Sequence, residues 1–505
     1  MEVRSLVVTR FSFVLAAVFC AASVLAQAPS PAESADNARL LFRQGEFQAA
    51  AIAFQKLIDR RPAPEFYAGL VQSLLKQDNV DDAELVSSRA MTALPKSALI
   101  HAMRGDVLFR RGLIGDAESE YRAALEWDEK CARAWLGMGR IFAAISRRAR
   151  AREAFSKARE LDPEDGDAFY YWAVGLEYPK NVAGLEAHLA GYRSDPERDR
   201  HEREYLALQK AVAGRKVWVP GHEIVASEIK LEQMLLGPGR VLGVGLKVRF
   251  NNHVSARLLL DTGASGITIG HKLAEKMKAT KLSDFSLEGA GDSGPVAGYE
   301  AWVDKISIGD FEFHDCVIHV SGRNQVGLQD GIIGTDIFEK YLITLDLIRQ
   351  KLRLAPLPDT TSTAAEEDKP APETASFSQV FSFGHLLLMP TRVGSTASGL
   401  FVLDTGSLTN AISPALARQV SNVHDSNVQV NGMSGAVKNV YSADATVLQF
   451  SRFRQPNQDI VTFDVRSINK DLGTEVSGFI GFASLKNLKV VIDYRDGLVD
   501  FDDKK

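Results

Sequence analysis

The second half of this chain carries the same four short motifs twice, in the same order. The first motif is Asp-Thr-Gly, at residues 261–263 and again at 404–406. The other pairs are Gly-Asp-Ser-Gly-Pro-Val at 291–296 with Gly-Met-Ser-Gly-Ala-Val at 432–437, Gly-Ile-Ile-Gly at 331–334 with Gly-Phe-Ile-Gly at 478–481, and Leu-Asp-Leu at 345–347 with Ile-Asp-Tyr at 492–494. Corresponding motifs lie between 141 and 147 residues apart. Chance matches would not stay in step over such a distance, so the pattern predicts a duplicated domain.

Each Asp-Thr-Gly triplet follows a run of apolar residues, Leu-Leu-Leu at 258–260 and Leu-Phe-Val-Leu at 400–403. This pattern places Asp261 and Asp404 at the ends of buried strands, on tight glycine turns. The pseudo-twofold symmetry of a duplicated domain would bring the two carboxylates together. Two carboxylates a few ångströms apart share one proton, because both cannot ionise cheaply. The repeated Asp346 and Asp493 are interpreted as strand-end carboxylates outside this site.

In these motifs the chain resembles the retropepsin-like aspartyl proteases, over about residues 241–505. Each lobe of that family carries Asp-Thr-Gly-Ala/Ser, a glycine-rich flap hairpin and a hydrophobic-hydrophobic-Gly segment. The resemblance implies two all-β lobes, lobe 1 at residues 241–357 and lobe 2 at 378–505, joined by a flexible linker at 358–377 that is rich in Pro, Ala, Thr and Glu. A strand at 241–250, a turn at Asn251-Asn252 and a return strand at 253–260 fit such a lobe. Short helices are expected at 336–340 and 483–487.

The resemblance also implies roles for single residues. Asp261 and Asp404 would form the catalytic dyad. The residues expected to support the dyad are Thr262, Gly263 and Ala264 in lobe 1, and Thr405, Gly406 and Ser407 in lobe 2. The residues expected in two flaps, and in substrate binding, are Gly291, Ser293, Gly294, Gly432, Ser434 and Gly435. Because Ser407 has a hydroxyl that Ala264 lacks, we expect this hydroxyl to donate to Asp404, lower its pKa and make it the ionised partner.

These expectations together describe an aspartic endopeptidase that acts on a protein or peptide. The ionised aspartate would activate a water, and its protonated partner would donate to the scissile carbonyl. Neither a metal nor an organic cofactor is implied. Two alternatives stay open: a noncatalytic scaffold that keeps the fold and binds peptides, and a protease whose lobes pair between two chains.

Residues 29–215 have a helical pattern that repeats about every 34 residues. Small residues recur at Ala50, Ala83, Ala117, Ala151 and Gly184, and prolines follow twelve residues later at Pro62, Pro95, Pro163 and Pro196. This pattern resembles the tetratricopeptide repeat, an all-α solenoid with two helices per unit and proline where the second helix ends. Such a solenoid often binds peptides or proteins, so we expect a partner or the substrate there. Residues 202–213 are interpreted as a capping helix and 216–240 as a connector, and the repeats are expected to be dispensable for cleavage of short peptides.

Residues 1–28 resemble a secretory signal peptide, with Arg4 and Arg10 before a mostly apolar stretch and small residues for cleavage near Ala26. The stretch is shorter than the ~20 residues that span a bilayer. We therefore expect an exported protein, periplasmic or secreted, without a membrane span after cleavage. Cys131 and Cys316 lie in different predicted domains, so a disulfide is not expected. The net charge of -5 gives no basic surface for nucleic acid.

Overall fold

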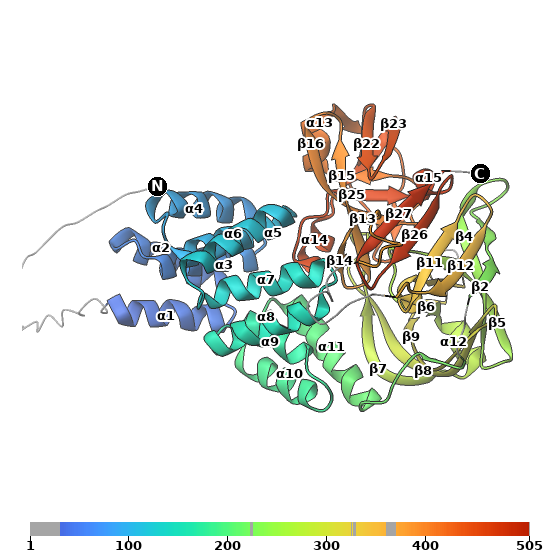
Figure 1. Ribbon diagram of the computed structural model, residues 1–505, viewed down its shortest axis with the longest axis horizontal. Helices are drawn as coiled ribbons and strands as arrows, with labels where there is room; N and C mark the ends of the chain where they lie inside the picture. Colours follow the sequence, from blue (N-terminus) through green and yellow to red (C-terminus); the bar gives the residue numbers. More distant parts are fainter. Residues whose placement is uncertain (1–30, 223–225, 325, 327–329, 360–369, 504–505) are drawn as a thin grey trace, which may run out of the picture.

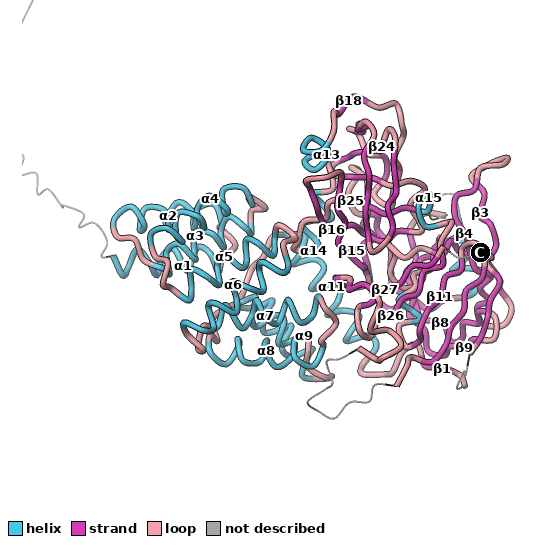
Figure 2. The backbone as a smooth tube through the Cα atoms, turned by 45° about the horizontal axis from the view of Figure 1, so that its top comes forward, coloured by secondary structure: helices cyan, strands magenta, loops and turns pink. Residues whose placement is uncertain are grey.

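The computed structural model describes residues 31–222, 226–324, 326, 330–359 and 370–503. The expected signal peptide at 1–28 and the middle of the expected linker lie outside these residues. In the described chain, a helical solenoid is followed by a β-rich part, as the sequence pattern predicts (Figure 1). The two parts are seen as a helical and a stranded region side by side in Figure 2. Among the described helices, none combines the length and apolar character needed to cross a membrane.

In the part of the chain that the structure describes, the solenoid has five helix pairs. These are α1 (Pro31–Arg43) with α2 (Phe47–Arg60), α3 (Pro64–Lys76) with α4 (Val80–Ala93), α5 (Ala98–Arg110) with α6 (Ile114–Trp127), α7 (Ala132–Ala144) with α8 (Arg148–Leu161), and α9 (Gly166–Val174) with α10 (Lys180–Gly191). Small residues allow the helices to approach closely. A Cβ atom on Gly69 would lie 2.4 Å from the ring of Phe54, and one on Gly105 would lie 2.6 Å from the ring of Tyr121. The small residues of the predicted repeat therefore mark the places where neighbouring helices pack closely.

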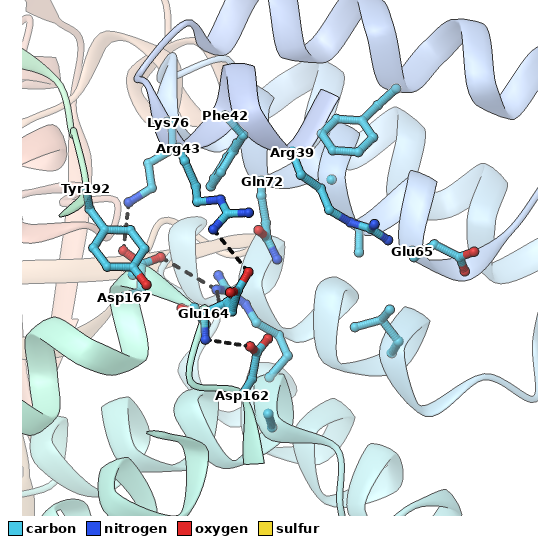
Figure 3. A pocket seen from close by; sticks show the side chains of 18 of the residues that line it. Arg39, Phe42, Arg43, Glu65, Gln72, Lys76, Asp162, Glu164, Asp167 and Tyr192 are labelled. Carbon is cyan, nitrogen blue, oxygen red and sulfur yellow. Dashed lines mark hydrogen bonds and ion pairs between the residues drawn. The ribbon is translucent and has the colours of Figure 1, made fainter. Parts of the chain in front are cut away.

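The solenoid closes on itself, because the loop after α10 returns to α1. The amide of Arg193 donates to the carbonyl oxygen of Arg43 at 3.2 Å. Two ion pairs join the first helices to the start of the fifth pair. Arg43 pairs with Glu164, in the turn before α9, at 3.1 Å, and Lys76 pairs with Asp167 of α9 at 2.7 Å. The inner surface forms a partly open cavity of about 650 Å³ that charged and aromatic side chains line (Figure 3).

A capping helix, α11 (Pro196–Val212), follows the last pair. It begins six residues before the predicted start, because Asp195 accepts hydrogen bonds from the amides of Glu197 and Arg198 and caps the first turn. Pro196, which we expected at the end of a repeat, is the first residue of this helix. A proline just after a capping aspartate marks a helix start, and the repeat pattern concealed this signal.

The described residues of lobe 1 form a nine-stranded sheet with the order β1-β9-β6-β10-β5-β4-β8-β7 and β3 paired to β4. Its strands are β1 (Val219–Pro220), β3 (Glu232–Leu235), β4 (Val241–Phe250), β5 (Val254–Leu260), β6 (Ile267–Gly270), β7 (Thr280–Leu287), β8 (Val296–Ile308), β9 (Phe311–Ser321) and β10 (Gly331–Ile333). Helix α12 (His271–Met277) and the 3₁₀ turn η1 (Asp336–Phe338) complete it. The predicted hairpin of β4 and β5 is confirmed, and its turn residues Asn251 and Asn252 have positive φ.

Lobe 2 repeats this plan in a ten-stranded sheet, with the order β18-β21-β24-β17-β25-β16-β15-β22-β23 and β14 paired to β15. Its strands are β14 (Phe381–Phe383), β15 (Leu386–Val393), β16 (Ala397–Asp404), β17 (Ala411–Ile412), β18 (Val423–Asp425), β21 (Val440–Ala443), β22 (Thr446–Phe450), β23 (Phe453–Asn457), β24 (Ile460–Phe463) and β25 (Gly478–Gly481). A separate hairpin has strands β19 (Asn431–Gly432) and β20 (Gly435–Ala436). The helices are α13 (Pro414–Val420), α14 (Arg466–Leu472) and α15 (Phe482–Leu485).

A third sheet joins the two lobes within one chain. It has the order β13-β27-β26-β11-β12-β2, with strands β2 (Ser227–Lys230), β11 (Tyr341–Asp346), β12 (Lys351–Pro356), β13 (Ser378–Gln379), β26 (Lys489–Asp493) and β27 (Leu498–Asp502). Strands β11 and β26, which carry the fourth motif pair, are antiparallel neighbours, with Leu345 opposite Val490. Asp346 and Asp493 end these strands and accept amide hydrogen bonds in their own turns, at 2.9 and 3.2 Å. The fourth motif pair is therefore part of the lobe interface.

The repeats and lobe 2 share one hydrophobic core. Buried Phe109 and Tyr121 of the repeats belong to the same cluster as Leu388, Leu400 and Phe479 of lobe 2. Removal of the repeats would expose this apolar surface to water, which is unfavourable. We therefore no longer expect the repeats to be dispensable for cleavage.

Candidate active site

The two Asp-Thr-Gly turns stand at equivalent places in the two lobes. Asp261 directly follows β5, and Asp404 is the last residue of β16. In each lobe the strand of the hydrophobic-hydrophobic-Gly segment runs parallel to the strand that leads to the aspartate, β10 beside β5 and β25 beside β16. The sequence motifs thus come together in space as the resemblance implies.

Two buried threonines bind the turns to each other. The Thr262 hydroxyl donates to the carbonyl oxygen of Leu403 at 2.6 Å and accepts from the amide of Thr405 at 3.0 Å. The Thr405 hydroxyl donates to the carbonyl oxygen of Leu260 at 2.9 Å and accepts from the amide of Thr262 at 3.1 Å. These four reciprocal bonds fix one lobe against the other at the aspartates.

Each carboxylate lies against the turn of the opposite lobe. A Cβ atom on Gly406 would lie 2.4 Å from Cγ of Asp261, and one on Gly263 would lie 3.1 Å from Cγ of Asp404. Any side chain at position 406 would displace the Asp261 carboxylate. Glycine is therefore needed at this position for the close approach of the two aspartates.

The two aspartates have raised pKa values, and the shifts are unequal. Burial, and next the charge of Asp404, raise the pKa of Asp261 well above its usual value. Burial also raises the pKa of Asp404, but the amides of Ser407 and Gly406, each donating to its Oδ1 at 2.9 Å, work in the opposite direction. Asp261 Oδ1 accepts from the amide of Gly263 at 2.8 Å. The pair titrates as a unit, and the hydrogen bond from the amide of Ser407 favours the charge on Asp404.

The Ser407 hydroxyl does not produce this asymmetry, so our expectation about it is wrong. Its Oγ donates to the carbonyl oxygen of Thr409 at 3.0 Å. The backbone amide of Ser407 makes the bond to Asp404, whereas the amide of Ala264 donates to the main-chain oxygen of Asp261 at 3.2 Å. The difference lies in the course of the two turns, which the side chains at these positions do not reveal.

Three residues support the site that the sequence analysis did not single out. Asp336 accepts from the Ser265 hydroxyl at 3.0 Å and from the amide of Gly266, which holds the end of the lobe 1 turn. Asn410 accepts from the amide of Gly481 at 2.9 Å in lobe 2. Nε2 of His385 lies 3.2 Å from the carbonyl oxygen of Gly263, and burial lowers the pKa of this ring, which favours its neutral form. Asp336 lies two residues after the Gly-Ile-Ile-Gly motif, so a search of the residues that follow this motif could have found it.

The two predicted flaps meet at their tips. The flap of lobe 1 is the loop 288–295 between β7 and β8, and the flap of lobe 2 is the β19–β20 hairpin. The amide of Ser293 donates to the carbonyl oxygen of Ser434 at 2.8 Å, and the amide of Ser434 donates to the carbonyl oxygen of Ala290 at 3.0 Å. A Cβ atom on Gly291 would lie 2.4 Å from the backbone of Ser434, and one on Gly432 would lie 2.3 Å from that of Ala290. Gly435 belongs to the same contact, because its Cβ would lie 2.5 Å from the Ser293 hydroxyl, whereas around Gly294 there is open space.

One group of potential metal ligands occurs in the described chain, away from the dyad. Side-chain atoms of His201, Glu288 and Asp471 lie within 4.8 Å of one another. The Glu288 carboxylate is already bound by the guanidinium of Arg200 and lies 3.2 Å from Nε2 of His201. This cluster is an ion-pair network between α11, the lobe 1 flap and α14.

Family comparisons agree with the two-part architecture. A model of the aspartyl protease family matches residues 246–337, which lie in lobe 1. A model of the tetratricopeptide repeat matches residues 35–98 and 102–166. The chain therefore contains tetratricopeptide repeats followed by a retropepsin-like aspartyl protease domain. No curated protein matches the sequence significantly.

Solved structures resemble the chain over about a third of its length. The Cut9–Hcn1 hetero-tetramer of the APC/C is 19% identical, with 34% of each chain covered and a TM-score of 0.30. A thermophilic tetratricopeptide-repeat protein of Thermus thermophilus is 18% identical, with 35% of this chain and 97% of that chain covered and a TM-score of 0.28. The pilF protein of Pseudomonas aeruginosa is 15% identical, with 35% and 89% covered and a TM-score of 0.25.

Proposed function

We propose that this protein is an aspartic endopeptidase whose site forms between the two lobes of one chain. The observation that carries the proposal is the set of reciprocal threonine bonds, which hold two carboxylates face to face. The raised pKa values of both aspartates support it, because one shared proton is what this chemistry requires. A turn kept only for folding would need neither two carboxylates nor their mutual approach.

The unequal pKa shifts favour distinct roles for the two aspartates. Asp404, ionised, takes a proton from a water held between the carboxylates, and the hydroxide oxygen bonds to the scissile carbon. Asp261, protonated, donates to the carbonyl oxygen, which yields a neutral tetrahedral diol. The proton on Asp404 then moves to the amide nitrogen, the C–N bond breaks, and a hydroxyl proton returns to Asp261. Each proton transfer is general acid or base catalysis, worth roughly 10²–10⁴-fold.

The flaps and the repeats would bind the substrate. We propose that the flaps, bonded through Ser293 and Ser434, separate to admit a peptide and close again to exclude water. The repeats would recruit a protein partner or the substrate through their inner cavity of about 650 Å³. We also propose that the protein is exported. The amino-terminal residue of the purified mature protein tests this, since cleavage near Ala26 is expected.

The test of the proposed activity is cleavage of a diverse peptide library by the full protein between pH 3 and 7. Asp261→Asn and Asp404→Asn should each abolish cleavage and leave the fold intact. Asp346→Asn is the matched control, because it changes a duplicated aspartate at the lobe interface and should retain activity. Turnover near that of the wild type in either dyad variant would refute the proposed chemistry. Peptide binding without any cleavage by the wild type would favour the scaffold.

Mixing the two inactive variants tests where the site forms. If the lobes pair within one chain, every molecule in the mixture lacks one carboxylate, and the mixture stays inactive. Recovery of activity on mixing would mean that lobes pair between chains, because half of the exchanged sites would then hold both aspartates. The wild-type protein at the same total concentration is the reference for this assay.

A further inference from the structure

Helix α11 of the repeat domain lies beside strand β7, which leads into the flap of lobe 1 (Figure 1). Glu204 Oε1 accepts a hydrogen bond from the hydroxyl of Ser286, on flap strand β7, at 2.7 Å. One residue beyond the end of this strand, Glu288 is bound by the guanidinium of Arg200, and Nε2 of His201 lies 3.2 Å from its carboxylate. The base of the flap is therefore attached to a helix outside the protease lobes.

The same helix is fixed on its other side by the wall of the repeat cavity. Nη2 of Arg198 lies 3.7 Å from Oδ1 of Asp167, and Nζ of Lys76 lies 2.7 Å from the same oxygen. Lys76 and Asp167 both line the cavity (Figure 3). Residues two apart on an α-helix project in nearly opposite directions, at about 200°. Arg198 therefore faces the cavity wall, while Arg200 faces the flap.

We propose that α11 is a positioning element for the lobe 1 flap, and that the ion cluster at Asp167 fixes α11, so that cavity wall and flap move together. Arg198 and Arg200 are the positioning residues. A displacement of the cavity wall that releases Arg198 would shift the helix, and the flap would follow because Glu288 is bound to it. The effect on peptide cleavage rests on the proposed function, whereas the position of the flap does not.

The contact between α11 and the flap is polar, and its hydrogen bonding is incomplete. Nη1 of Arg200 and Oε2 of Glu204 are buried and have no hydrogen-bond partner among the described residues, and Nη1 lies only within ion-pair distance of Oε1 of Glu204, at 3.6 Å. Buried polar groups without partners weaken a contact compared with one in which every group is bonded. Such an interface can open at a low cost in free energy, whereas opening the apolar core between the repeats and lobe 2 would cost much more.

Hydrogen exchange of the flap amides tests this coupling. The full protein with Asp404→Asn avoids self-cleavage, and amides 287–296 are followed in this background. Arg200→Gln should accelerate their exchange about tenfold, as expected for loss of a partly buried, charge-assisted contact. Arg198→Gln should accelerate the same amides at least threefold, although Arg198 faces away from the flap. Lys210→Gln is the matched control, because Lys210 lies on α11 and, among the described residues, pairs only with the exposed Glu186 at 2.6 Å. Its flap amides should exchange as in the background.

Unchanged flap exchange in a folded Arg198→Gln protein would overturn the coupling, and unchanged exchange in Arg200→Gln would overturn the positioning role. If Arg198→Gln does not fold, two other variants take its place. The flap amides of Arg198→Lys should exchange as in the background, and those of Glu288→Gln should exchange as fast as in Arg200→Gln. In active protein, Arg198→Gln should change kcat/KM for a peptide at least threefold without moving the pH profile. Loss of all activity in the wild type would refute the proposed function and leave the exchange result valid.

Discussion

The hydroxyl of Thr405 provides a quantitative test of how the two lobes are held at the active site. It donates to the carbonyl oxygen of Leu260 at 2.9 Å and accepts from the amide of Thr262 at 3.1 Å. The Thr405 residue is 1% exposed, so water does not replace the hydroxyl when it is removed. Thr405→Val keeps the shape of the side chain and deletes both bonds, which leaves one buried N–H and one buried C=O without a partner.

The structure gives the size of the effect. A buried polar group left without a partner costs about 1–3 kcal/mol, so two such groups predict a loss of about 2–6 kcal/mol in the free energy of unfolding. Domains are commonly stable by only about 5–15 kcal/mol, so this loss should be readily measured. Because the bonds cross the lobe interface next to the aspartates, kcat should fall together with stability.

Urea denaturation, followed by tryptophan fluorescence in the Asp404→Asn background, measures the stability change. Thr405→Ser is the matched control, since it keeps the hydroxyl and removes only a methyl group, and it should lose about 1 kcal/mol. Thr262→Val should behave like Thr405→Val, because its hydroxyl makes the mirror-related bonds to Leu403 and Thr405. A loss under about 0.5 kcal/mol in Thr405→Val, or an equal loss in Thr405→Ser, would refute the role of the cross-lobe bonds.

Three further outcomes follow from the structure. Ser407→Ala should leave the acidic limb of the pH–rate profile unchanged, because the Ser407 amide and not its hydroxyl contacts Asp404; an upward shift would restore the hydroxyl to that role. Burial raises the pKa of Glu300 from 4.5 to about 7, so the stability of the wild type should fall as the pH rises from the unfolded pKa to the folded pKa. At pH 8, Glu300→Gln should be more stable than the wild type by about 2–3 kcal/mol. Thermal denaturation curves measured at several pH values test this. Deletion of residues 31–212 should yield aggregated, inactive protein by gel filtration and peptide assay, and a soluble active product would show that lobe 2 does not need the shared core.

The sequence predicted those features of the site that depend on local backbone geometry. The turn at Gly406 lies so close to Asp261 that only a residue without a side chain fits there. This requirement is visible in the sequence as the triplet Asp-Thr-Gly, which occurs at 404–406 and again at 261–263. The strand, turn and strand at 241–260 were likewise predicted from alternation and a pair of asparagines. Such features are visible because the requirement and the residue that meets it lie in the same short segment.

The shared core left a signal that was present but ambiguous. Strand β16 has the run Leu400-Phe401-Val402-Leu403, and all four residues are buried. Phe401 and Leu403 pack in the core of the lobes, while Leu400 and Val402 pack in the cluster shared with the repeats. A strand buried on both faces reads as a continuous apolar run. The run predicted burial on both sides, but the sequence does not name the element that covers the second face.

The contact of α11 with the flap could not be predicted for a different reason. Arg200 and Glu204 are charged residues on a helix, and charges four apart are typical of a solvated surface. Their partners, Glu288 and Ser286, lie more than 80 positions away in the sequence. Nothing in either segment alone distinguishes a solvated charge from one that is bound to another domain.

Fusion of the two lobes allows the active site to be asymmetric. In a homodimer the two aspartates have identical surroundings before substrate binds, so neither is fixed as acid or base. Here the turn of lobe 2 directs two amides to Asp404, whereas in lobe 1 the amide of Ala264 is directed to a main-chain oxygen. The charge is thereby favoured on Asp404 before substrate arrives. The same asymmetry extends outward, because α11 holds the flap of lobe 1 while the repeat core packs on lobe 2. A duplicated chain can thus give its two halves different partners and different protonation states while the cross-lobe threonine bonds keep their symmetry.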